Sequence, residues 1–529
     1  MLTYTLDKSR SDFLYEQLYL ALKDDIERGR LAAGERLPSK RALAAHLGVS
    51  VVTIEKAYSQ LVDEGYLAAR PKSGYYVTKI EAPLPAQKPS PAHSIHLAPS
   101  LSATTTAASP LGGGAPQGAK GAIASNLSIH LTPKRSNSTT AASPSGGGAP
   151  QGAEGAIASN LPSQPFADFT ANQLSPENFP FTSWARALKQ TLAERQKELM
   201  ETTPVSGAME LRTAIAAHLA SFRGMSVSPE QIVIGAGTEY LYSLVVRFLG
   251  TEKIFALENP GYAKVRRIYE GCGARCRSVP LDASGLDITR LRESGASVAH
   301  ISPSHHFPTG LVMPIARRYE LLAWASECPG RYILEDDYDS EFRFVGRPIP
   351  TLFSIDAAAK VIYLNTFSKT LTPTIRLSYM VLPAPLAERF RARLSFLACP
   401  VSNFEQYTLA RFIEGGHFEK HLARMRTLYR KKRDLLIRAI KESPLRGHAE
   451  IIEQSSGLHL LLKLATQKSD AELKRRFQKQ SLKVDFLADY YQSPREAPAH
   501  ILLLNYSSIQ KEKIPAAIAR LAKAVGEKA

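Results

Sequence analysis

The chain has 529 residues and a formal net charge of +17. Its length exceeds what one hydrophobic core usually spans, so two or three folded units are expected, and the basic balance favours a polyanionic partner, although a basic surface can also serve solubility alone. Four cysteines without a Cys-x-x-Cys pair or zinc-finger spacing indicate a reducing compartment and no metal. Without a signal peptide or a membrane-length apolar run, we expect a cytoplasmic protein without membrane contact.

The positive charge is not concentrated near the N-terminus. Residues 1–80 contain 12 Lys/Arg against 10 Asp/Glu, and residues 81–165 contain 4 against 2, so residues 166–529 carry +13. A basic footprint for a polyanion would therefore involve the C-terminal part. The run "RMRTLYRKKR" (Arg424–Arg433), together with three nearby arginines, is either such a footprint or a solvated helix face. Those three are Arg389, Arg391 and Arg393.

Residues 10–80 are expected to form a winged helix-turn-helix domain. Four apolar residues at a spacing of four predict its first helix. They are Leu14, Leu18, Leu22 and Ile26. In the stretch from Leu37 to Val77, Pro38 and Ser39 open a second helix, a Gly-Val turn follows, and Ser50 caps a third helix. The alternating "GYLAARPKSGYYV" after it predicts a two-stranded wing.

Double-stranded DNA is the expected partner of this domain. In a helix-turn-helix the exposed first turn of the second motif helix enters the major groove, and nearby cations meet phosphates. A small helical domain that binds protein or nothing is the alternative, but turn, cap and wing coincide here. The candidate DNA contacts are Ser39, Lys40, Arg41, Ser50, Val51, Thr53, Lys56, Arg70, Lys72 and Gly74.

These residues resemble the winged helix of GntR-type bacterial regulators. That family commonly reads Ser-Arg-x-Thr at the start of its recognition helix, whereas this chain reads Ser50-Val51-Val52-Thr53. Arg is the usual bidentate reader of guanine, so a specific base contact of the family is missing. Val51 and Val52 could contact thymine methyl groups instead.

Residues 81–165 are expected to be a flexible linker rich in Gly, Pro, Ala and Ser. Within it "AASPLGGGAPQGAKGAIASNL" (Ala107–Leu127) recurs as "AASPSGGGAPQGAEGAIASNL" (Ala141–Leu161), a duplication with a period of 34 residues. Two copies this rich in Gly and Pro cannot build a helical solenoid. A tether of roughly 80 residues would have a root-mean-square reach of about 50 Å.

Residues 166–529 are expected to form an α/β domain around a mainly parallel sheet. Short apolar runs such as "QIVIGAG", "RYILEDDY" and "KVIYLNTFSK" alternate with helical patterns, which is typical of βα units. Ligands of such sheets bind at the carboxyl ends of the strands. The polar residues that close these runs are therefore the candidate site.

Three strand ends carry reactive or anion-binding residues. One supplies Asp336 and Tyr338, another Ser368 and Lys369, and the third a Gly-rich turn at a helix start, Gly235–Glu239. Each alone is more often a cap, a solvated terminus or a plain turn. Together a lysine, a buried acid and an anion site are what pyridoxal 5'-phosphate needs, because the lysine forms a Schiff base and the acid keeps the pyridine nitrogen protonated.

From Phe166 onward the chain resembles the fold-type I aminotransferases, which depend on pyridoxal 5'-phosphate. The resemblance implies that Lys369 forms the internal aldimine, that Asp336 contacts the pyridine nitrogen and that Tyr338 contacts the ring hydroxyl, these three being catalytic. Tyr262 of "ENPGY" would stack on the ring. The other cofactor-binding residues implied are Ala236, Gly237, Thr238, Ser368 and Arg376.

The order of winged helix, linker and aminotransferase-like domain resembles the MocR (GabR-like) branch of the GntR regulators. "SPSHHFPTG", "EDDYDSEF" and "NTFSKTLTPTIRLSYMVLP" carry this resemblance. Aminotransferases usually place an Asn, bonded to the ring hydroxyl of the cofactor, where this chain has Phe307. Loss of that hydrogen bond weakens electrophilic activation and favours sensing over turnover.

The resemblance also suggests where an effector would bind. Amino-acid-sensing relatives often carry an Arg two positions after the stacking Tyr262, where this chain has Lys264, a point charge instead of a bidentate fork. A second effector Arg, expected around Asp489, is also missing. The hypothesis is that Tyr262 and Lys264 contact an amine or amino acid that is not a simple γ-amino acid, or whose carboxylate is held differently.

The sequence therefore predicts a transcription regulator, homodimeric as in the family, that senses an amino compound or the cofactor through an aldimine at Lys369. The ligand must bind one arrangement of the protein better than another to change how the paired winged helices sit on DNA. One alternative is an active aminotransferase with an accessory DNA-binding domain. Another is a regulator whose only signal is the phosphorylated cofactor. In the main interpretation the protein is not a physiological enzyme, and residual transamination is the most that is expected.

Overall fold

The computed structural model describes residues 4–7, 13–70, 73–79, 165–171, 174–344, 349–452 and 457–526. The expected linker of residues 81–165 lies outside this range apart from its last position, and so does Lys72 in the turn of the wing. Among the described residues, no helix is both long enough and apolar enough to cross a membrane. The four cysteines are all described, and none of them forms a disulfide.

The N-terminal domain has the predicted helix-turn-helix and wing. It consists of α1 (Leu14–Glu27), α2 (Lys40–Leu47), α3 (Val51–Asp63) and the antiparallel strands β1 (Leu67–Arg70) and β2 (Gly74–Val77). The side chain of Ser39 accepts a hydrogen bond from the Ala42 amide, and that of Ser50 accepts one from the Thr53 amide, so both expected N-caps are confirmed. Gly48 at φ 62° ends α2 in the left-handed conformation.

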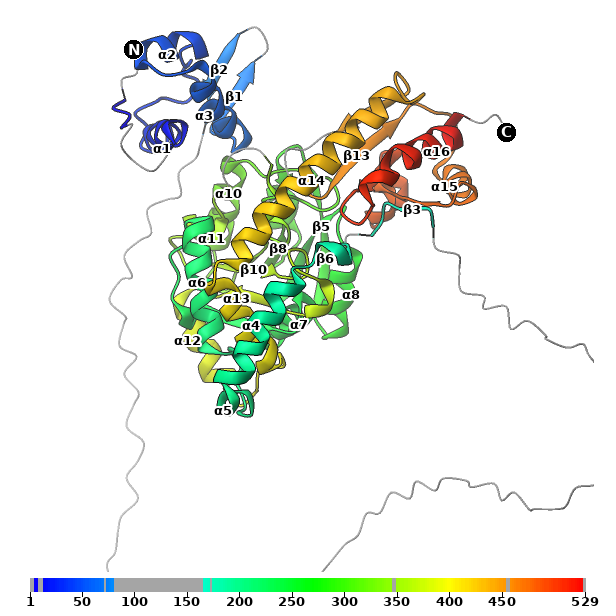
Figure 1. Ribbon diagram of the computed structural model, residues 1–529. Coiled ribbons are helices and arrows are strands. Elements are labelled where there is room, and N and C mark those ends of the chain that lie inside the picture. Colours follow the sequence, from blue (N-terminus) through cyan, green and yellow to red (C-terminus); the bar gives the residue numbers. More distant parts are fainter. Residues whose placement is uncertain are drawn as a thin grey trace, which may run out of the picture. The chain divides into compact units, whose positions relative to one another are not determined.

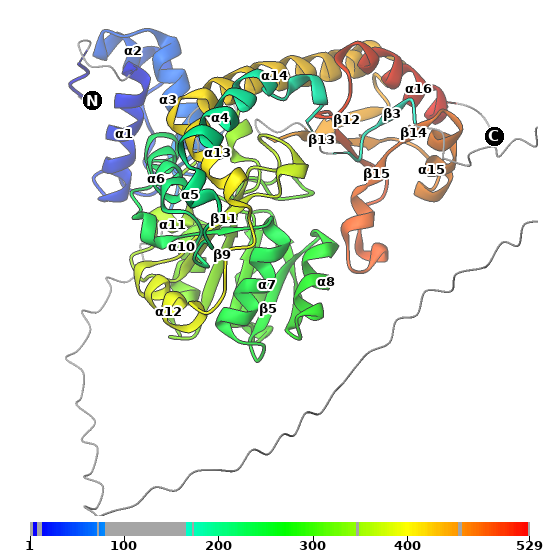
Figure 2. The same ribbon diagram turned by 60° about the horizontal axis from the view of Figure 1, so that its bottom comes forward.

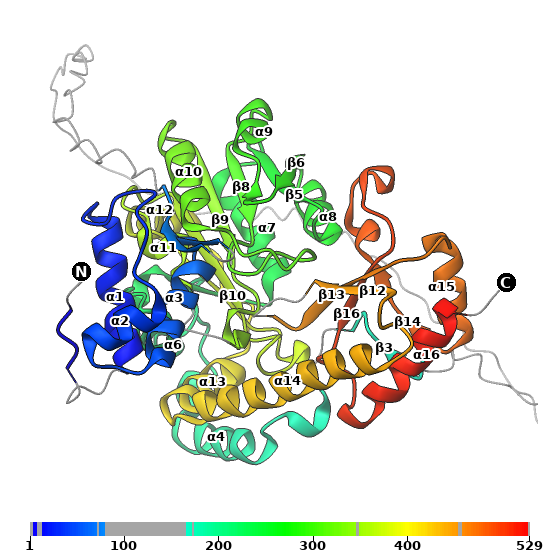
Figure 3. The same cartoon turned by 90° about the horizontal axis from the view of Figure 1, so that it is seen from above.

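An eight-stranded sheet forms the centre of the large domain. Its order is β4 (Ile232–Gly235), β11 (Ser378–Val381), β10 (Val361–Thr366), β9 (Tyr332–Asp336), β8 (Val298–Ile301), β5 (Ile254–Asn259), β6 (Arg275–Asp282) and β7 (Gly285–Leu286). The pairs β10–β9, β9–β8, β8–β5 and β5–β6 are parallel, whereas β11 runs antiparallel to both neighbours. The predicted mainly parallel sheet is confirmed (Figure 3).

Alternate residues of the central strands face opposite layers of helices. In β10, Ile362 and Leu364 pack with α7 (Thr238–Leu249), α8 (Ala263–Gly271) and α12 (Ala384–Leu394), whereas Tyr363 packs with α6 (Met209–Arg223) and α13 (Asn403–Glu414). Near the other half of the sheet, that second layer contains α9 (Ile288–Glu293) and α10 (Ile315–Ser326). Because helices cover both faces of the sheet, both sets of alternate residues are apolar, and the buried strands read as continuous apolar runs.

A smaller C-terminal subdomain follows the long helix α14 (His417–Glu442), which runs from the large sheet to it (Figure 1). Its antiparallel sheet has the order β12 (Ala449–Ile452), β13 (His459–Leu464), β16 (Ile501–Asn505) and β15 (Asp485–Phe486). The helices α15 (Asp470–Lys479) and α16 (Ile514–Gly526) accompany it (Figure 2). The strand β3 (Ala167–Asp168) pairs with β14 (Leu482–Lys483), so the start of the domain belongs to this subdomain.

The remaining helices pack near the start of the large domain. The helix α4 (Phe181–Glu194) precedes the short α5 (Gln196–Leu199), and α11 (Leu352–Ile355) is a single turn before β10. Trp184 of α4 contacts Phe412 of α13, with ring centroids 5.6 Å apart. This contact joins α4 to α13, which packs on the sheet in the layer that also contacts Tyr363.

Candidate functional site

The carboxyl ends of β9, β10 and β4 bring the three predicted strand ends together. Asp336, the last residue of β9, pairs in register with Leu364 of β10, and Thr366 at the end of β10 pairs with Ser378 of β11. Ser378 in turn pairs with Gly235, the last residue of β4. Adjacent strands therefore place the acid, the lysine loop and the Gly-rich turn at one edge of the sheet.

Asp336 is buried, and its two carboxylate oxygens have different surroundings. Oδ2 accepts a hydrogen bond from the Tyr242 hydroxyl and lies 3.3 Å from His300 Nε2. Oδ1 is also buried but has no hydrogen-bond partner among the described residues. A buried carboxylate oxygen without a donor is costly, so this atom is suited to a cationic N–H donor from a ligand.

Lys369 lies in the turn after β10, in a partly buried position. Burial lowers its pKa, and the nearby carboxylates of Asp339 and Asp336 oppose that shift. Lowering the pKa of a lysine increases the fraction of neutral amine, which is the nucleophilic form. The amide of Ser368 donates to Thr366 Oγ1 at 3.1 Å, and this bond holds the turn that presents Lys369.

The Gly-rich turn between β4 and α7 forms a cradle that has no side chain at Gly237. Gly237 adopts φ 87°, and a Cβ atom there would lie 2.6 Å from Arg376 Nη2. Arg376 donates to the Ala236 carbonyl at 3.4 Å and is half exposed, while Thr238 begins α7. A helix N-terminus beside an arginine is suited to a phosphate group.

Aromatic side chains surround the remaining part of the site. Tyr262 is 55% exposed, and its ring centroid lies 6.1 Å from that of Phe307 in an edge-to-face arrangement. The Phe307 ring also packs edge-on against Tyr490, at 5.0 Å. The ring centroid of Tyr338 lies 6.5 Å from that of Phe307, and the Tyr338 hydroxyl is 3.2 Å from His305 Nδ1. The Tyr262 ring is thus accessible to a ligand that stacks on it, whereas the Phe307 ring packs against neighbouring aromatic side chains.

The candidate effector residue Lys264 is already paired. Its ammonium group forms an ion pair with Glu239 near the start of α7, and Glu239 is also 3.7 Å from Arg376. The positive neighbours lower the pKa of Glu239, with the Lys264 hydrogen bond as the largest cause. A ligand carboxylate at Lys264 would therefore compete with Glu239.

Sequence reasoning did not find several residues that support the site. Tyr242 and His300 hold Asp336, and Arg223 forms a buried ion pair with the neighbouring Asp337. His305 contacts Asp339 at 2.9 Å. A polar residue within an apolar stretch, such as the histidine in the buried strand "VAHI", was the available sequence signal. The residues that it contacts are brought together only by the tertiary structure, so they could not be identified.

The predicted DNA-contacting residues cluster on the helix-turn-helix motif and the wing. Val51 and Val52 are 41% and 56% exposed at the first turn of α3, as a reading position requires. Arg41 and Lys56 are exposed, and Arg70 stacks over the ring of Tyr76 in the wing. Lys40 is paired with Glu55 of α3 at 2.6 Å, which leaves it less available to a phosphate.

Four further candidates have structural positions of their own. Ser39 and Ser50 are N-caps, Thr53 donates its amide to Ser50, and Gly74 adopts φ 118° at the start of β2. The capping bonds orient the amino ends of α2 and α3. These residues shape the interface, whichever atoms meet the nucleic acid.

The basic run in α14 is largely engaged with its own domain. Arg424, Arg426 and Arg430 donate to the backbone carbonyls of Asn178, Glu341 and Phe344 at 2.6, 2.6 and 2.9 Å. Lys432 is buried and donates to the Ser507 carbonyl at 2.6 Å, and burial lowers its pKa to about 8. These contacts favour the interpretation of the run as a structural helix face.

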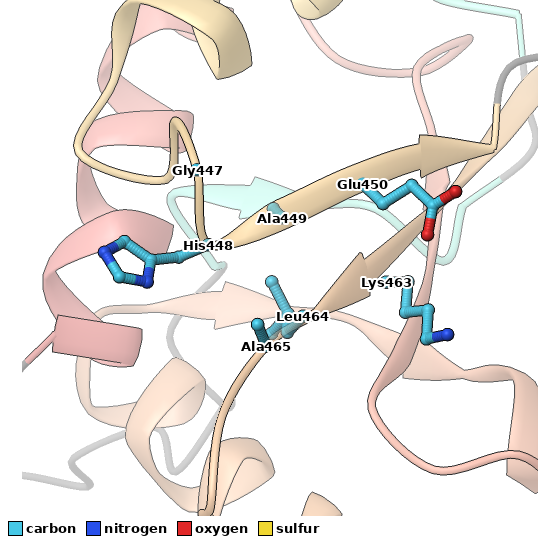
Figure 4. A pocket seen from close by; sticks show the side chains of 7 residues that line it. All are labelled: Gly447, His448, Ala449, Glu450, Lys463, Leu464 and Ala465. Carbon is cyan, nitrogen blue, oxygen red and sulfur yellow. The ribbon is translucent and has the colours of Figure 1, made fainter.

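A shallow concavity of about 230 Å³ lies elsewhere, beside β12 and β13 (Figure 4). Its lining residues are Gly447, His448, Ala449, Glu450, Lys463, Leu464 and Ala465. Figure 4 shows the side chains of Glu450 and Lys463 near each other at its rim. None of the candidate site residues lines it, so the strand ends of the large sheet remain the candidate site.

Two families match successive parts of the chain. Residues 14–77 match "Bacterial regulatory proteins, gntR family", and residues 165–490 match "Aminotransferase class I and II". The chain is 32% identical over 508 residues to the HTH-type transcriptional regulator YdeL of Bacillus subtilis, across 96% of both chains. It is 30% identical to "Probable rhizopine catabolism regulatory protein MocR" of Rhizobium meliloti, across 95% of this chain and 92% of that protein.

A solved structure matches the large domain alone. It is kynurenine aminotransferase from Pyrococcus horikoshii, which shares 25% sequence identity at a TM-score of 0.60 and covers 69% of this chain and 91% of that chain. The enzyme match thus leaves out the DNA-binding part, whereas the regulators align along nearly their whole length. The chain therefore belongs to the MocR-type regulators of the GntR family, DNA-binding proteins with an aminotransferase-like domain of fold type I.

Proposed function

We propose that this regulator binds pyridoxal 5'-phosphate at Lys369 and uses the loaded site to sense an amino compound. The observation that carries the proposal is the buried Oδ1 of Asp336, which has no hydrogen-bond partner in the described part of the chain, while Oδ2 is held by Tyr242 and His300. A protonated pyridine nitrogen is a donor of matching charge for this oxygen.

The phosphate cradle supports the same ligand. Gly237 offers backbone without a side chain at the amino end of α7, and Arg376 covers it. Ala236, Thr238 and Ser368 line the same edge of the sheet. Backbone amides and a guanidinium group at this point are suited to a dianionic phosphate, and they do not fit a neutral group as well.

The residues of the chain have separate tasks in this proposal. When bound, pyridoxal 5'-phosphate supplies an electrophilic carbon for amines and a ring that accepts electrons. Lys369 holds the cofactor covalently, helped by its lowered pKa, and Tyr262 covers the ring. Asp336 keeps the pyridine nitrogen protonated, and Tyr338 contacts the ring hydroxyl.

An amine or amino acid is the proposed effector, and its carboxylate, if present, has to compete with Glu239 for Lys264. Because Lys264 stands in place of an arginine and no arginine lies near Asp489, the proposed effector is not a simple γ-amino acid, or its carboxylate is held differently. We also propose a homodimer, because GntR-type helix-turn-helix domains read two half-sites when paired. The effector changes DNA binding only by the difference in its affinity for two arrangements of that dimer.

Phe307 favours sensing over catalysis. Its ring contacts Tyr490, Tyr262 and His459, with centroid distances of 5.0, 6.1 and 5.5 Å, so it offers no donor to a cofactor oxygen. An active aminotransferase is the second candidate function, which the presence of both Lys369 and Asp336 permits. A regulator whose only signal is the cofactor is the third.

Borohydride reduction of the cofactor-treated protein tests the binding proposal directly. Reduction fixes a Schiff base, and peptide mapping then identifies the modified lysine. The expected product is a modification at Lys369 that Lys369→Ala removes. Lys189→Ala, a change at an exposed lysine of α4, serves as the control and should leave the labelling intact. Labelling spread over surface lysines without Lys369 would contradict the proposal.

The absorption spectrum during titration with amines and amino acids separates the three candidate functions. A spectral shift that persists would identify an effector and a sensor. Conversion to the pyridoxamine form with release of a keto acid would identify an aminotransferase. A bound cofactor whose spectrum no amine changes would make the cofactor itself the signal.

A further inference from the structure

One nitrogen atom of the His305 side chain lies near two polar groups. His305 Nδ1 lies 2.9 Å from Asp339 Oδ2 and 3.2 Å from the Tyr338 hydroxyl. A neutral imidazole nitrogen either donates through N–H or accepts through its lone pair, and it cannot do both. The choice at Nδ1 therefore determines whether the Tyr338 hydroxyl can give its proton to His305.

The surroundings of the ring favour the N–H at Nδ1. Asp339 is buried, and a carboxylate is the stronger acceptor of the two neighbours. His305 Nε2 is buried and has no hydrogen-bond partner within the described ranges. An unpaired lone pair there costs less than an unpaired N–H, so the proton belongs on Nδ1, directed at Asp339.

Packing fixes the ring in this orientation. Gly457 lies directly against it, since a Cβ atom at Gly457 would be 1.8 Å from His305 Cε1. The ring of His459 lies 4.9 Å away between centroids. The imidazole is thus confined on several sides.

With Nδ1 donating to Asp339, the proton of the Tyr338 hydroxyl has to point elsewhere. Burial is the largest cause that raises the pKa of Tyr338 well above its ordinary value, so the hydroxyl keeps its proton at neutral pH. Phe307 beside it has no polar atom to receive that proton. The hydroxyl is left as a donor for a ligand in the site.

We propose that His305, oriented by Asp339, is a positioning residue that keeps the Tyr338 hydroxyl donating to the bound cofactor instead of to the protein. This inference rests on the proposed function, because it concerns the cofactor at Lys369. Without His305, the hydroxyl would turn to the Asp339 carboxylate. The pair thereby sets the electronic state of the ring oxygen that Tyr338 contacts.

Other charged and titratable groups face these three side chains. The acids are Glu258, Asp336 and Asp337, and the bases are Arg223, Arg343, Lys369, His306 and His459. Burial keeps both additional histidines neutral by lowering their pKa values. Burial raises the pKa of Glu258 to about 8, so it titrates within the useful range and has to be present in every variant compared.

The test is an absorbance titration with pH of the cofactor-loaded full chain without effector. A hydrogen bond donated to the ring oxygen stabilises its negative charge and weakens its hold on the neighbouring imine proton. Tyr338→Phe and His305→Ala should each raise the pKa of the linkage at Lys369 by about one, a tenfold change in proton affinity. The double variant should match Tyr338→Phe alone.

Two further variants separate positioning from general packing. Asn can donate from about the place of Nδ1, so His305→Asn should restore the parental titration. His218→Asn is the control, because this buried imidazole lies 3.3 Å from Glu419 and contacts neither Asp339 nor Glu258, and it should leave the titration unchanged.

Several results would overturn the inference. A shift by His305→Ala of equal size in the Tyr338→Phe background would show that His305 acts by another route. An unchanged titration in Tyr338→Phe would overturn it whether or not His305→Ala folds. If the unaltered protein never acquires the cofactor absorbance, the proposed function itself fails, and that outcome differs from a loaded protein with unmoved variants.

Discussion

Glu258 and His306 form a buried pair in which neither side chain is charged at neutral pH. Glu258 Oε2 accepts a hydrogen bond from the Ser302 amide at 3.0 Å and lies 3.5 Å from His306 Nε2. Burial raises the pKa of Glu258 to about 8 and lowers that of His306 to about 3. The Glu258 carboxyl and the His306 imidazole are therefore both uncharged at neutral pH, and they lie near Asp336 and His305 of the candidate site.

Replacing Glu258 by Gln should therefore stabilise the cofactor-free protein as pH rises. The folded state holds the Glu258 proton up to a pKa of about 8, whereas an unfolded chain releases it near 4.5, so this group contributes stability below that lower value and loses it as pH rises through the window. In thermal melts, the free energy of unfolding of the variant should exceed that of the parent by a difference that grows to a few kcal/mol between about pH 5 and 8.

A control at an exposed acid distinguishes this effect from a general loss of charge. Glu293 is largely exposed and pairs with Arg290 on the surface, so Glu293→Gln should shift the melts by a small amount that does not depend on pH. A constant difference between Glu258→Gln and the parent over the same range would show that Glu258 is already ionised in the folded state.

Gly237 offers a second test at the scale of single residues. Gly237→Ala would place a Cβ atom 2.6 Å from Arg376 Nη2 at φ 87°, and we expect affinity for pyridoxal 5'-phosphate to fall by about tenfold or more. Gly224, at φ 64° and ψ 20°, has no atom within 4 Å, so Gly224→Ala tests a left-handed position away from the site, with milder strain than at Gly237 with φ 87° and ψ 166°. Fluorescence titration with the cofactor should separate the two. Equal affinities would contradict the cradle.

At the scale of elements, Ser50 determines how the recognition helix begins. Its Oγ accepts from the Thr53 amide at 3.1 Å, directly beside the exposed Val51 and Val52. Ser50→Ala should destabilise α3 by about 1 kcal/mol and speed hydrogen exchange at its first turn. Ser59→Ala, an exposed position in the middle of α3, is the control. Unchanged exchange in α3 would mean that the cap contributes nothing measurable.

The sequence predicts those parts of the site that depend on short-range pattern. The caps of α2 and α3, the wing, and the strands that end at Asp336 and Lys369 follow from spacing and turn residues, and the structure confirms them as elements. The support of Asp336 by Tyr242 and His300 could not be predicted in this way, because α7, β8 and β9 meet only after the sheet assembles.

Over the whole molecule, the role of the charged residues is likewise only partly predictable from the sequence. The sequence assigns +13 to residues 166–529 and suggests a basic footprint, but the run in α14 faces carbonyl oxygens of its own domain. A side chain that already donates to a buried or nearby carbonyl has less freedom to meet a phosphate. A count of charges along a sequence does not distinguish these two uses.

Salt dependence of DNA binding by the full chain decides between them. Arg41 and Arg70 project from the helix-turn-helix domain, so each change to Gln should reduce the slope of log affinity against log salt by about one. Arg426→Gln and Arg430→Gln should leave the slope unchanged and lower thermal stability instead, since each leaves a partly buried carbonyl without its donor. A flatter slope in the α14 variants would instead establish the large domain as part of the DNA interface.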